Sequence, residues 1–338
     1  MKILCPIDNS YDIDVLDPKT YNTEFFFGYI PIWWIKKHTD SVAFELENIL
    51  SVPINNRNDL KANVTDLRMV EEIVKKADAN RTDAYLVLNA KYYPEYVYDD
   101  LKLYLDEIYS VGVRKVIACD IGIISYLEDN YPEIKVAVSC LNQISNSKAV
   151  SFYLNFSNVT RIVFPRHMAI EEITKIASCY PNIEFEYFIF SNKCLYDDGY
   201  CRSVHAFTPI CKDLFYNEFY STSNKSISDK LFKELNRTAD EYRNWSKSLL
   251  SSQIKGCCTP NFACSACSLV KSNKYKNIIS VKISIRGHSI EERKRQVDMA
   301  KKLIDASKKG SKKEIQSMLC KLFGKEDICS SENHCMMK

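Results

Sequence analysis

The stretch KVIACDIGIISYLEDNYPEIKVAVS, residues 115–139, contains two short apolar runs separated by a helical stretch. The runs are Lys115 to Cys119 and Ile134 to Ser139, and both contain valine and isoleucine. Continuous apolar runs of this length are typical of strands that are buried on both faces. A strand, a helix and a strand in this order predict two parallel strands with the helix packed outside them.

The same alternation repeats along the chain. Residues 66–76, for example, place Leu67, Val70 and Ile73 on one face of a predicted helix. Eight strand-like runs predict an α/β fold, a TIM-barrel-like (β/α)8 barrel, with an irregular or incomplete barrel as the alternative form. An open doubly wound sheet has the same local pattern, but no Gly-x-Gly-x-x-Gly follows the first strand, which favours the barrel. The predicted strands are residues 2–7, 25–30, 84–90, 115–119, 134–139, 161–164, 184–190 and 278–285.

The length of 338 residues suits one barrel with additions. We expect residues 1–305 to form a barrel-like catalytic domain with a cysteine-rich, metal-binding insertion at residues 191–270. Residues 306–338 predict a polar C-terminal helix and a mobile tail, and the cysteines of this region are expected to be free thiols.

Composition narrows the partners. The 46 basic and 43 acidic residues leave a formal net charge of +3, which argues against a nucleic-acid wrapper and against DNA, while a local basic patch for RNA remains open. No apolar run reaches the roughly 18 to 20 residues that span a bilayer, so no membrane partner is expected. The chain opens MKILCP, without the pattern of a secretory signal, which predicts a cytoplasmic protein.

Seven of the 14 cysteines fall within residues 194–267. In a reducing cytosol, grouped cysteines favour metal binding over disulfides. Four thiolates suit either a four-iron four-sulfur cluster or zinc. The pair Cys194-x6-Cys201 is too open for a zinc knuckle, which favours the cluster, with zinc as the alternative. The candidate metal ligands are Cys194, Cys201, Cys211, Cys264 and Cys267, and Cys257 and Cys258 are interpreted mainly as structural thiols.

Catalytic groups of a barrel lie at the carboxyl ends of its strands. Arg166, Arg286, His288 and Asp120 follow predicted strands and are the candidate catalytic residues. The first three have the chemistry to hold a carboxylate or phosphate by charge-assisted hydrogen bonds. For each of them a surface position or a helix-end contact is the competing interpretation.

Residues 186–201, EYFIFSNKCLYDDGYC, resemble the signature of peptidase family U32, the collagenase-like group. Residues 264–269, CSACSL, are similar to the family's Cys-Gly-Ala-Cys-Ala-Leu, and residues 281–287, VKISIRG, are similar to its Leu-Lys-Ile-x-Gly-Arg. The resemblance covers roughly residues 60 to 305. One departure is Phe190-Ser191, which stands where the family has His-Gly, so no role of that histidine is carried over.

The resemblance implies a barrel that carries a four-iron four-sulfur cluster and is sensitive to oxygen. The family includes proteins of oxygen-independent hydroxylation that act on transfer RNA, ribosomal RNA or the ubiquinone ring. By similarity the ligands would be Cys194, Cys201, Cys211 and either Cys264 or Cys267, of which Cys264 fits the spacing slightly better. Arg202 and His205 adjoin Cys201 and would contact the cofactor through hydrogen bonds to its ligands.

Three functions follow as hypotheses. The first is a cluster-dependent hydroxylase or related redox enzyme acting on RNA or on an aromatic or peptide metabolite. The second is a peptidase or other hydrolase, although the sequence has no His-Glu-x-x-His, no Gly-x-Ser-x-Gly and only five histidines. The third is a noncatalytic, cluster-bearing subunit that works with a related protein partner.

Overall fold

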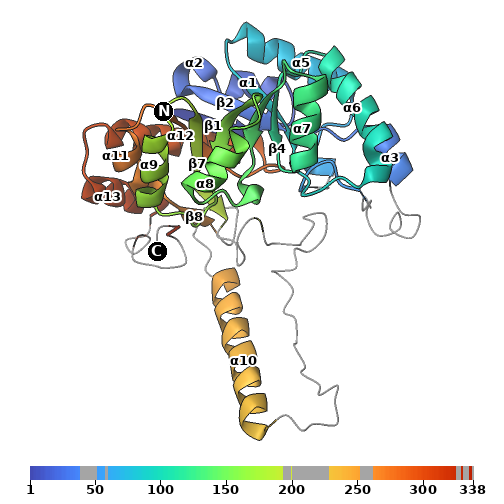
Figure 1. The fold of residues 1–338 in the computed structure, drawn as a ribbon. Coiled ribbons are helices and arrows are strands. Elements are labelled where there is room, and N and C mark those ends of the chain that lie inside the picture. Colours follow the sequence, from blue (N-terminus) through green and yellow to red (C-terminus); the bar gives the residue numbers. More distant parts are fainter. Residues whose placement is uncertain are drawn as a thin grey trace.

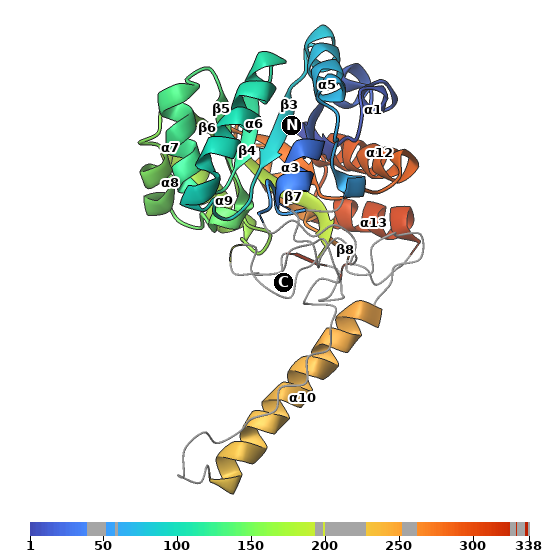
Figure 2. The ribbon, with the colours of Figure 1, turned by 90° about the vertical axis from the view of Figure 1, so that its right-hand side faces the viewer.

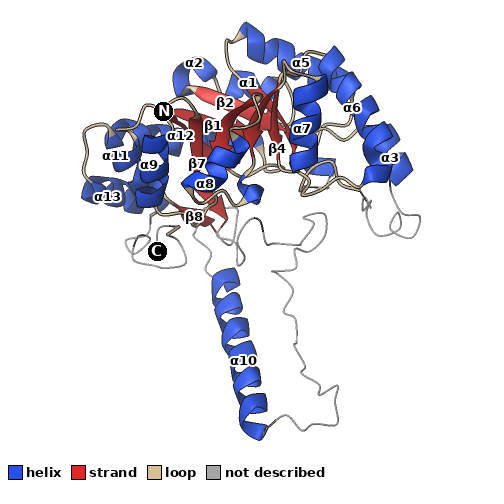
Figure 3. Cartoon of the chain, viewed as in Figure 1, coloured by secondary structure: helices blue, strands red, loops and turns tan. Residues whose placement is uncertain are grey.

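A computed structural model describes residues 1–38, 52–57, 60–192, 199, 228–251, 262–324, 329 and 335–336. Its strands form a closed barrel inside a layer of helices (Figures 1 and 3). The strands are β1 (Lys2–Pro6), β2 (Thr23–Phe27), β3 (Ala84–Leu88), β4 (Lys115–Ala118), β5 (Lys135–Val138), β6 (Val159–Val163), β7 (Glu184–Asn192), β8 (Phe262–Cys264) and β9 (Ile278–Ile283).

Strand pairing closes the sheet. Parallel pairs run in order from β1 to β7, β7 pairs with β9, and β9 pairs with β1, so eight parallel strands form a ring. All eight are the strands that the sequence predicts, and the barrel is confirmed. Strand β8 is antiparallel to the end of β7 and lies outside the ring. Its three residues are too few for a periodic pattern, which is why the sequence did not predict it.

The helices cover the outer face of the barrel, and α10 projects away from it (Figure 2). The connection from β1 to β2 is irregular, because it holds only two helices of five and four residues. The α-helices are α1 (Tyr11–Val15), α2 (Pro18–Tyr21), α3 (Ile32–His38), α5 (Leu67–Ala79), α6 (Tyr98–Ser110), α7 (Ile121–Asn130), α8 (Ser147–Tyr153), α9 (Ile170–Cys179), α10 (Asp229–Ser251), α11 (Leu269–Ser272), α12 (Ile290–Ser307) and α13 (Lys312–Phe323). Short 3-10 helices are η1 (Leu60–Ala62), η2 (Glu95–Val97), η3 (Cys140–Asn142) and η5 (Ala266–Ser268).

Helix starts and apolar faces follow the sequence. The carboxylate of Asp66 accepts the Arg68 amide at the N-terminus of α5, and Val70 and Ile73 of this helix are buried. Helix α13 begins with a capping box at Ser311, buries its apolar face and places Phe323 edge-on to Phe190 of β7. The predicted C-terminal helix therefore packs against the body of the protein.

An ionic network fills the amino-terminal half of the barrel interior. Arg161 is 1% exposed and binds Glu24 at 2.7 Å, Glu184 at 2.9 Å and Glu186 at 3.1 Å. Lys282 lies 3.3 Å from Glu186. Charges at this depth remain ionised only when they are paired, so the network is a structural unit that closes the lower barrel. We therefore look for binding residues at the opposite end of the barrel, the mouth formed by the carboxyl ends of the strands.

Candidate functional site at the barrel mouth

Arg286 lies just beyond β9 and is fixed from several sides. Its Nη2 donates to Asn55 Oδ1 at 2.7 Å, and its main-chain oxygen accepts a hydrogen bond from Arg57 Nη1 at 2.9 Å. Gly28, the residue after β2, makes this packing possible, because a Cβ there would lie 2.8 Å from Arg286 Nη1 and 2.0 Å from Asn63 Oδ1. The predicted Arg286 is therefore a buried, preorganised cation at the mouth.

The segment 52–57 brings a second arginine to Arg286. The backbone amide of Asn56 donates a hydrogen bond of 3.0 Å to Oδ1 of Asn89, the residue just beyond β3. Asn63 Nδ2 donates to the Arg57 carbonyl at 2.7 Å. Sequence analysis missed Arg57, Asn55 and Asn63 because they lie in a loop without periodic pattern, and only the asparagine-rich composition of that loop hinted at turns.

His288 lies two residues beyond Arg286 and is partly buried. Burial lowers the pKa of His288, and the nearby charge of Arg57 lowers it further. The imidazole is therefore neutral near pH 7, so at that pH it acts through hydrogen bonds and not as a third cation.

Arg166 follows β6, on the other side of β7 from β9. Its guanidinium carbon lies 4.9 Å from the ring centroid of Phe188, a residue of β7. Such a cation–π contact orients the guanidinium plane while its edge remains able to donate hydrogen bonds. Arg166 and Arg286 thus stand at the ends of the two strands that flank β7.

Asp120 has a local structural contact. Its Oδ1 accepts the Ile123 amide at 2.9 Å as the N-cap of α7, and its Oδ2 accepts the Tyr93 amide at 3.2 Å. Both carboxylate oxygens bind backbone amides, which is the helix-end contact weighed as the competing interpretation. The geometry gives no support to Asp120 as an acid or base.

Gly199, from the family-like signature, lies at the mouth. Lys91 Nζ donates to the Gly199 carbonyl at 3.1 Å. A Cβ on Gly199 would lie 2.7 Å from the Leu141 carbonyl oxygen and 2.2 Å from Gln143 Cγ, in the turn after β5. Glycine is therefore the residue that this close approach requires.

Asn142 Nδ2 and Ser191 Oγ, both near the mouth, are among the buried polar atoms that have no hydrogen-bond partner in the described residues. Asn142 Oδ1 accepts the Cys119 thiol at 3.1 Å, so only its amide nitrogen remains available. Buried polar atoms of this kind mark a place where a bound molecule can complete the hydrogen bonding. The departure from the family pattern at residue 191 was the available signal for Ser191.

The predicted metal ligands divide into two groups. Cys194, Cys201 and Cys211, with Arg202 and His205, lie outside the described residues, as do Cys257 and Cys258. Strand β7 ends at Asn192, whose register partner is Phe262 of β8. Along the chain, Cys194 comes two residues after Asn192, and Cys264 comes two residues after Phe262. Cys264 itself pairs with Phe190 of β7.

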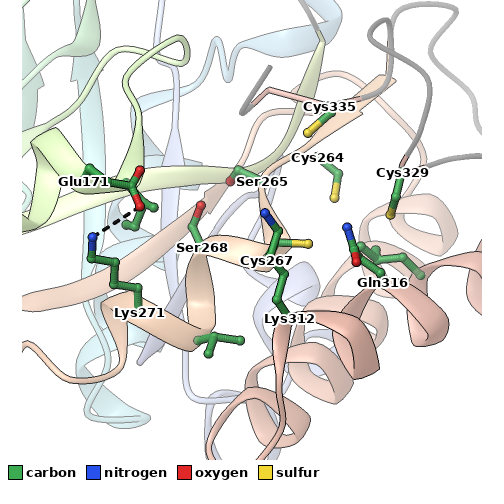
Figure 4. Close-up of a pocket in the computed structure, with 13 residues that line it drawn as sticks. Glu171, Cys264, Ser265, Cys267, Ser268, Lys271, Lys312, Gln316, Cys329 and Cys335 are labelled. Atoms are coloured by element: carbon green, nitrogen blue, oxygen red, sulfur yellow. Dashed lines mark hydrogen bonds and ion pairs between the residues drawn. The ribbon is translucent and has the colours of Figure 1, made fainter.

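Cys264 and Cys267 line a pocket of ≈ 310 Å³ beside the barrel, together with Cys329 and Cys335 (Figure 4). Cys335 forms a parallel bridge with Cys264, and the Met336 amide donates to the Cys264 carbonyl at 3.0 Å. In the part of the chain that the structure describes, no three His, Cys, Asp or Glu side chains are already arranged to hold a metal ion. Among these residues no helix is long and apolar enough to cross a membrane.

The fold and the site define an α/β-barrel protein with cationic side chains at the carboxyl ends of its strands and grouped thiols next to that end. The model of peptidase family U32 matches residues 36–334, and the chain belongs to this family. This confirms the resemblance seen in the sequence.

Curated relatives match over a shorter region. The chain is 27% identical to tRNA hydroxylation protein P of Escherichia coli over 97 residues, which is 29% of this chain and 21% of that protein. It is 29% identical to tRNA hydroxylation protein P of Haemophilus influenzae over 104 residues, which is 30% of this chain and 22% of that protein. These matches span about a fifth of the length of either relative. The solved structure of the U32 peptidase Mk0906 has a TM-score of 0.39 at 12% identity, with 57% of this chain and 69% of that chain covered.

Proposed function

We propose that the protein is an iron–sulfur enzyme of family U32 that hydroxylates RNA with an oxygen donor other than O₂. The observation that carries the proposal is the seating of Gly199 on the barrel mouth through Lys91 and the turn at Leu141. Gly199 lies two residues before the signature cysteine Cys201. The two curated relatives, both tRNA hydroxylation proteins, support RNA as the substrate class.

The cluster ligands in this proposal are Cys194, Cys201 and Cys211, with a fourth cysteine from the late segment. Cys264 and Cys267 are three positions apart in the sequence and, like the other described thiols, form no disulfide, which suits soft-metal binding. When bound, the cluster would supply one-electron transfer. The candidates for the fourth ligand are Cys257, Cys258, Cys264 and Cys267.

The cations at the mouth would bind the substrate anion. Arg286 and Arg57 are adjacent and held by asparagines, so little conformational entropy is lost when they grip a phosphate or carboxylate. Arg166 would contact the same substrate from beyond β6. Neutral His288 would donate or accept one hydrogen bond, and Ser191 Oγ and Asn142 Nδ2 would complete theirs on the substrate.

A cysteine-peptidase function is less well supported. Burial raises the pKa of the Cys119 thiol to about 12, and Lys91 lowers it only in part. A thiol with such a pKa is not a nucleophile at neutral pH. Burial also raises the pKa of Cys264 and Cys267. These thiols lie at or near the barrel mouth, and none of them has the lowered pKa that acyl transfer by a cysteine needs.

The first test is oxygen-free purification with iron and sulfide analysis and an absorption spectrum. We expect about four iron and four sulfide per chain, as in a four-iron four-sulfur centre. The cluster should be lost in Cys194→Ala and in Cys211→Ala. The matched control is Cys179→Ala, because Cys179 is exposed at the end of α9 and is not one of the predicted ligands. Zinc without iron at the signature cysteines would refute the proposal.

The second test concerns the reaction. The chain is expressed in bacteria that lack their own tRNA hydroxylation protein P, and nucleosides from digested tRNA are analysed by mass spectrometry. We expect nucleosides heavier by one oxygen atom with the wild-type chain and none with Cys194→Ala. Hydroxylation that appears only when a related protein is co-expressed would favour the subunit hypothesis. Absence of hydroxylation in both arms would exclude a role on tRNA.

A further inference from the structure

Asp8 lies at the barrel mouth, two residues beyond the end of β1. The parallel register pairs Leu4 of β1 with Lys282 of β9. Continued at the same offset, this register places Asp8 level with Arg286, which lies just beyond β9. Asp8 is not one of the catalytic residues that the sequence predicted, because its position next to Arg286 follows only from the pairing of the first and last strands of the ring.

The side chain of Arg286 reaches across the end of β1. Its Nη1 would lie 2.8 Å from a Cβ on Gly28, the residue just beyond β2. Strand β1 stands between β9 and β2 in the ring. A guanidinium that starts beyond β9 and ends at β2 therefore passes beside Asp8. The positive charge of Arg286 is accordingly one of the charges that act on the Asp8 carboxyl group.

The Asp8 carboxyl group is fixed through its Oδ2. This oxygen accepts a hydrogen bond of 2.6 Å from Nη2 of Arg293, a residue of α12 that is 3% exposed. Nη1 of Arg293 donates to Asp12 Oδ2 at 2.7 Å and to the Pro6 carbonyl at 3.2 Å. The backbone amide of Asp8 also donates to Asp12 Oδ2, at 2.7 Å. Because the side chain is already held in one orientation, little conformational entropy is lost when it binds a ligand.

The other carboxylate oxygen, Asp8 Oδ1, is buried and has no hydrogen-bond partner among the residues that the structure describes. The Asp8 side chain as a whole is 30% exposed, so it lies at the surface of the mouth. Burial raises the pKa of Asp8, the charge of Arg293 opposes this shift, and the charge of Asp12 adds to it. A hydrogen-bond donor at Oδ1 would offset the desolvation of the ionised carboxylate. A ligand that Arg286 holds is in a position to supply this donor.

A carboxylate acceptor beside a guanidinium donor fits the sugar-phosphate unit of RNA. The 2′-hydroxyl of a ribose is a donor next to the phosphate, and a guanidinium binds the phosphate oxygens. Carboxylates accept ribose hydroxyls in the same way at dinucleotide sites. DNA offers the phosphate without the hydroxyl. We propose that Asp8 Oδ1 accepts the 2′-hydroxyl of the nucleotide whose phosphate Arg286 binds, and that this contact selects RNA over DNA.

The inference rests on the proposed function in that it takes RNA as the substrate. It adds which group of the RNA is recognised and which residue recognises it. Binding of oligonucleotides is measured without the reaction, whereas iron content and tRNA hydroxylation test the proposed function. The two proposals can therefore fail separately.

The test is the affinity of the full chain for single-stranded oligonucleotides in a filter-binding assay. The probes share one base sequence, with uracil in place of thymine, and carry ribose, 2′-deoxyribose or 2′-fluororibose. The fluoro sugar lacks the donor but keeps a polar group of similar size, so it separates the hydrogen bond from the shape of the sugar. Wild type should bind the ribose probe about 10-fold or more tightly than either of the others, as expected for one hydrogen bond to a charged group.

Asp8→Asn should reduce this preference to about 3-fold or less, because its amide oxygen turns toward Arg293 and an NH₂ group replaces the acceptor. Asp8→Ala should do the same. The matched control is Asp66→Asn, which also replaces a carboxylate paired with an arginine, Arg68, and should keep the preference of wild type. A purely structural role of Asp8 would weaken the binding of all three probes alike.

Circular dichroism checks that each variant is folded, and the comparison of the three probes on wild type needs no variant. Equal binding of the three probes by wild type would overturn the inference and leave the proposed hydroxylation to its own tests. A preference that persists in folded Asp8→Asn or Asp8→Ala would overturn it as well. Wild type that binds none of the probes would overturn both this inference and RNA as the substrate class.

Discussion

Replacing Arg161 with methionine tests the ionic network inside the barrel. The change keeps much of the side-chain volume but leaves Glu24 and Glu186, which are 2% and 0% exposed at their side chains, without their shared cation. Removing one partner of a buried ion pair typically costs about 3–5 kcal/mol. Lys2 lies 2.5 Å from Glu24 and Lys282 lies 3.3 Å from Glu186, so part of the compensation remains. We therefore expect the substitution to lower the free energy of unfolding by about 3 kcal/mol, the lower end of this range.

The assay is thermal unfolding of wild type and Arg161→Met at several pH values. The unfolding entropy is about 2.1 cal/mol/K per residue, so in a chain of 338 residues a loss of about 3 kcal/mol corresponds to a fall in Tm of about 4 °C. In the variant the folded state binds more protons than the unfolded state, since buried carboxyls without a full counter-ion favour the neutral form. Stability of the variant relative to wild type should therefore rise as pH falls from 7 toward 5.

The control is Lys75→Met, which removes an exposed i,i+4 ion pair with Glu71 and should change stability by less than about 0.5 kcal/mol. The reasoning would be refuted if Arg161→Met melted within about 1 °C of wild type, a loss of under about 0.7 kcal/mol. A deficit that grew at low pH would contradict the assignment of the cost to the two carboxylates.

Three further predictions concern the mouth. Gly199→Ala should lower the iron content of protein purified without oxygen, because the new Cβ would lie 2.7 Å from the Leu141 carbonyl oxygen. An iron content equal to that of wild type would contradict the inference that this close approach positions the signature cysteines. Cys119 should react with iodoacetamide at pH 8 at least about 10-fold more slowly than exposed Cys179, because burial raises the pKa of the Cys119 thiol to about 12. Peptide mass spectrometry measures the two rates. Arg286→Ala should weaken RNA binding by about 10-fold or more in a filter-binding assay, because a charge-assisted hydrogen bond worth about 1.5–3 kcal/mol is lost. The control is Arg68→Ala, at the exposed start of α5.

Much of the architecture was predictable because it is local. Most of the parallel strands are short apolar runs, such as residues 115–119, and most are followed by an amphipathic stretch. The helix cap at Asp66 is also a local signal. Strand β8 and the very short helices between β1 and β2 were beyond such reasoning, because three to five residues carry too little periodicity.

The site was predictable only where it adjoins a strand. Arg286 and Arg166 were found because active groups of a barrel follow its strands. Asp120 satisfied the same rule but caps α7, and the sequence does not distinguish these two roles. Arg57 was missed because its position depends on the loop that folds back against Arg286.

The sequence by itself predicted the barrel, its parallel strands and the family relationship, because hydrophobic periodicity and motif spacing are properties of residues that are close along the chain. The pairing of Arg161 with Glu24, across 137 positions, exists only because the sheet closes and brings two inward-facing side chains together. The bridge between Cys335 and Cys264 likewise joins residues that are 71 positions apart in the sequence. Contacts between distant residues are set by closure and packing, and composition or spacing does not encode them separately.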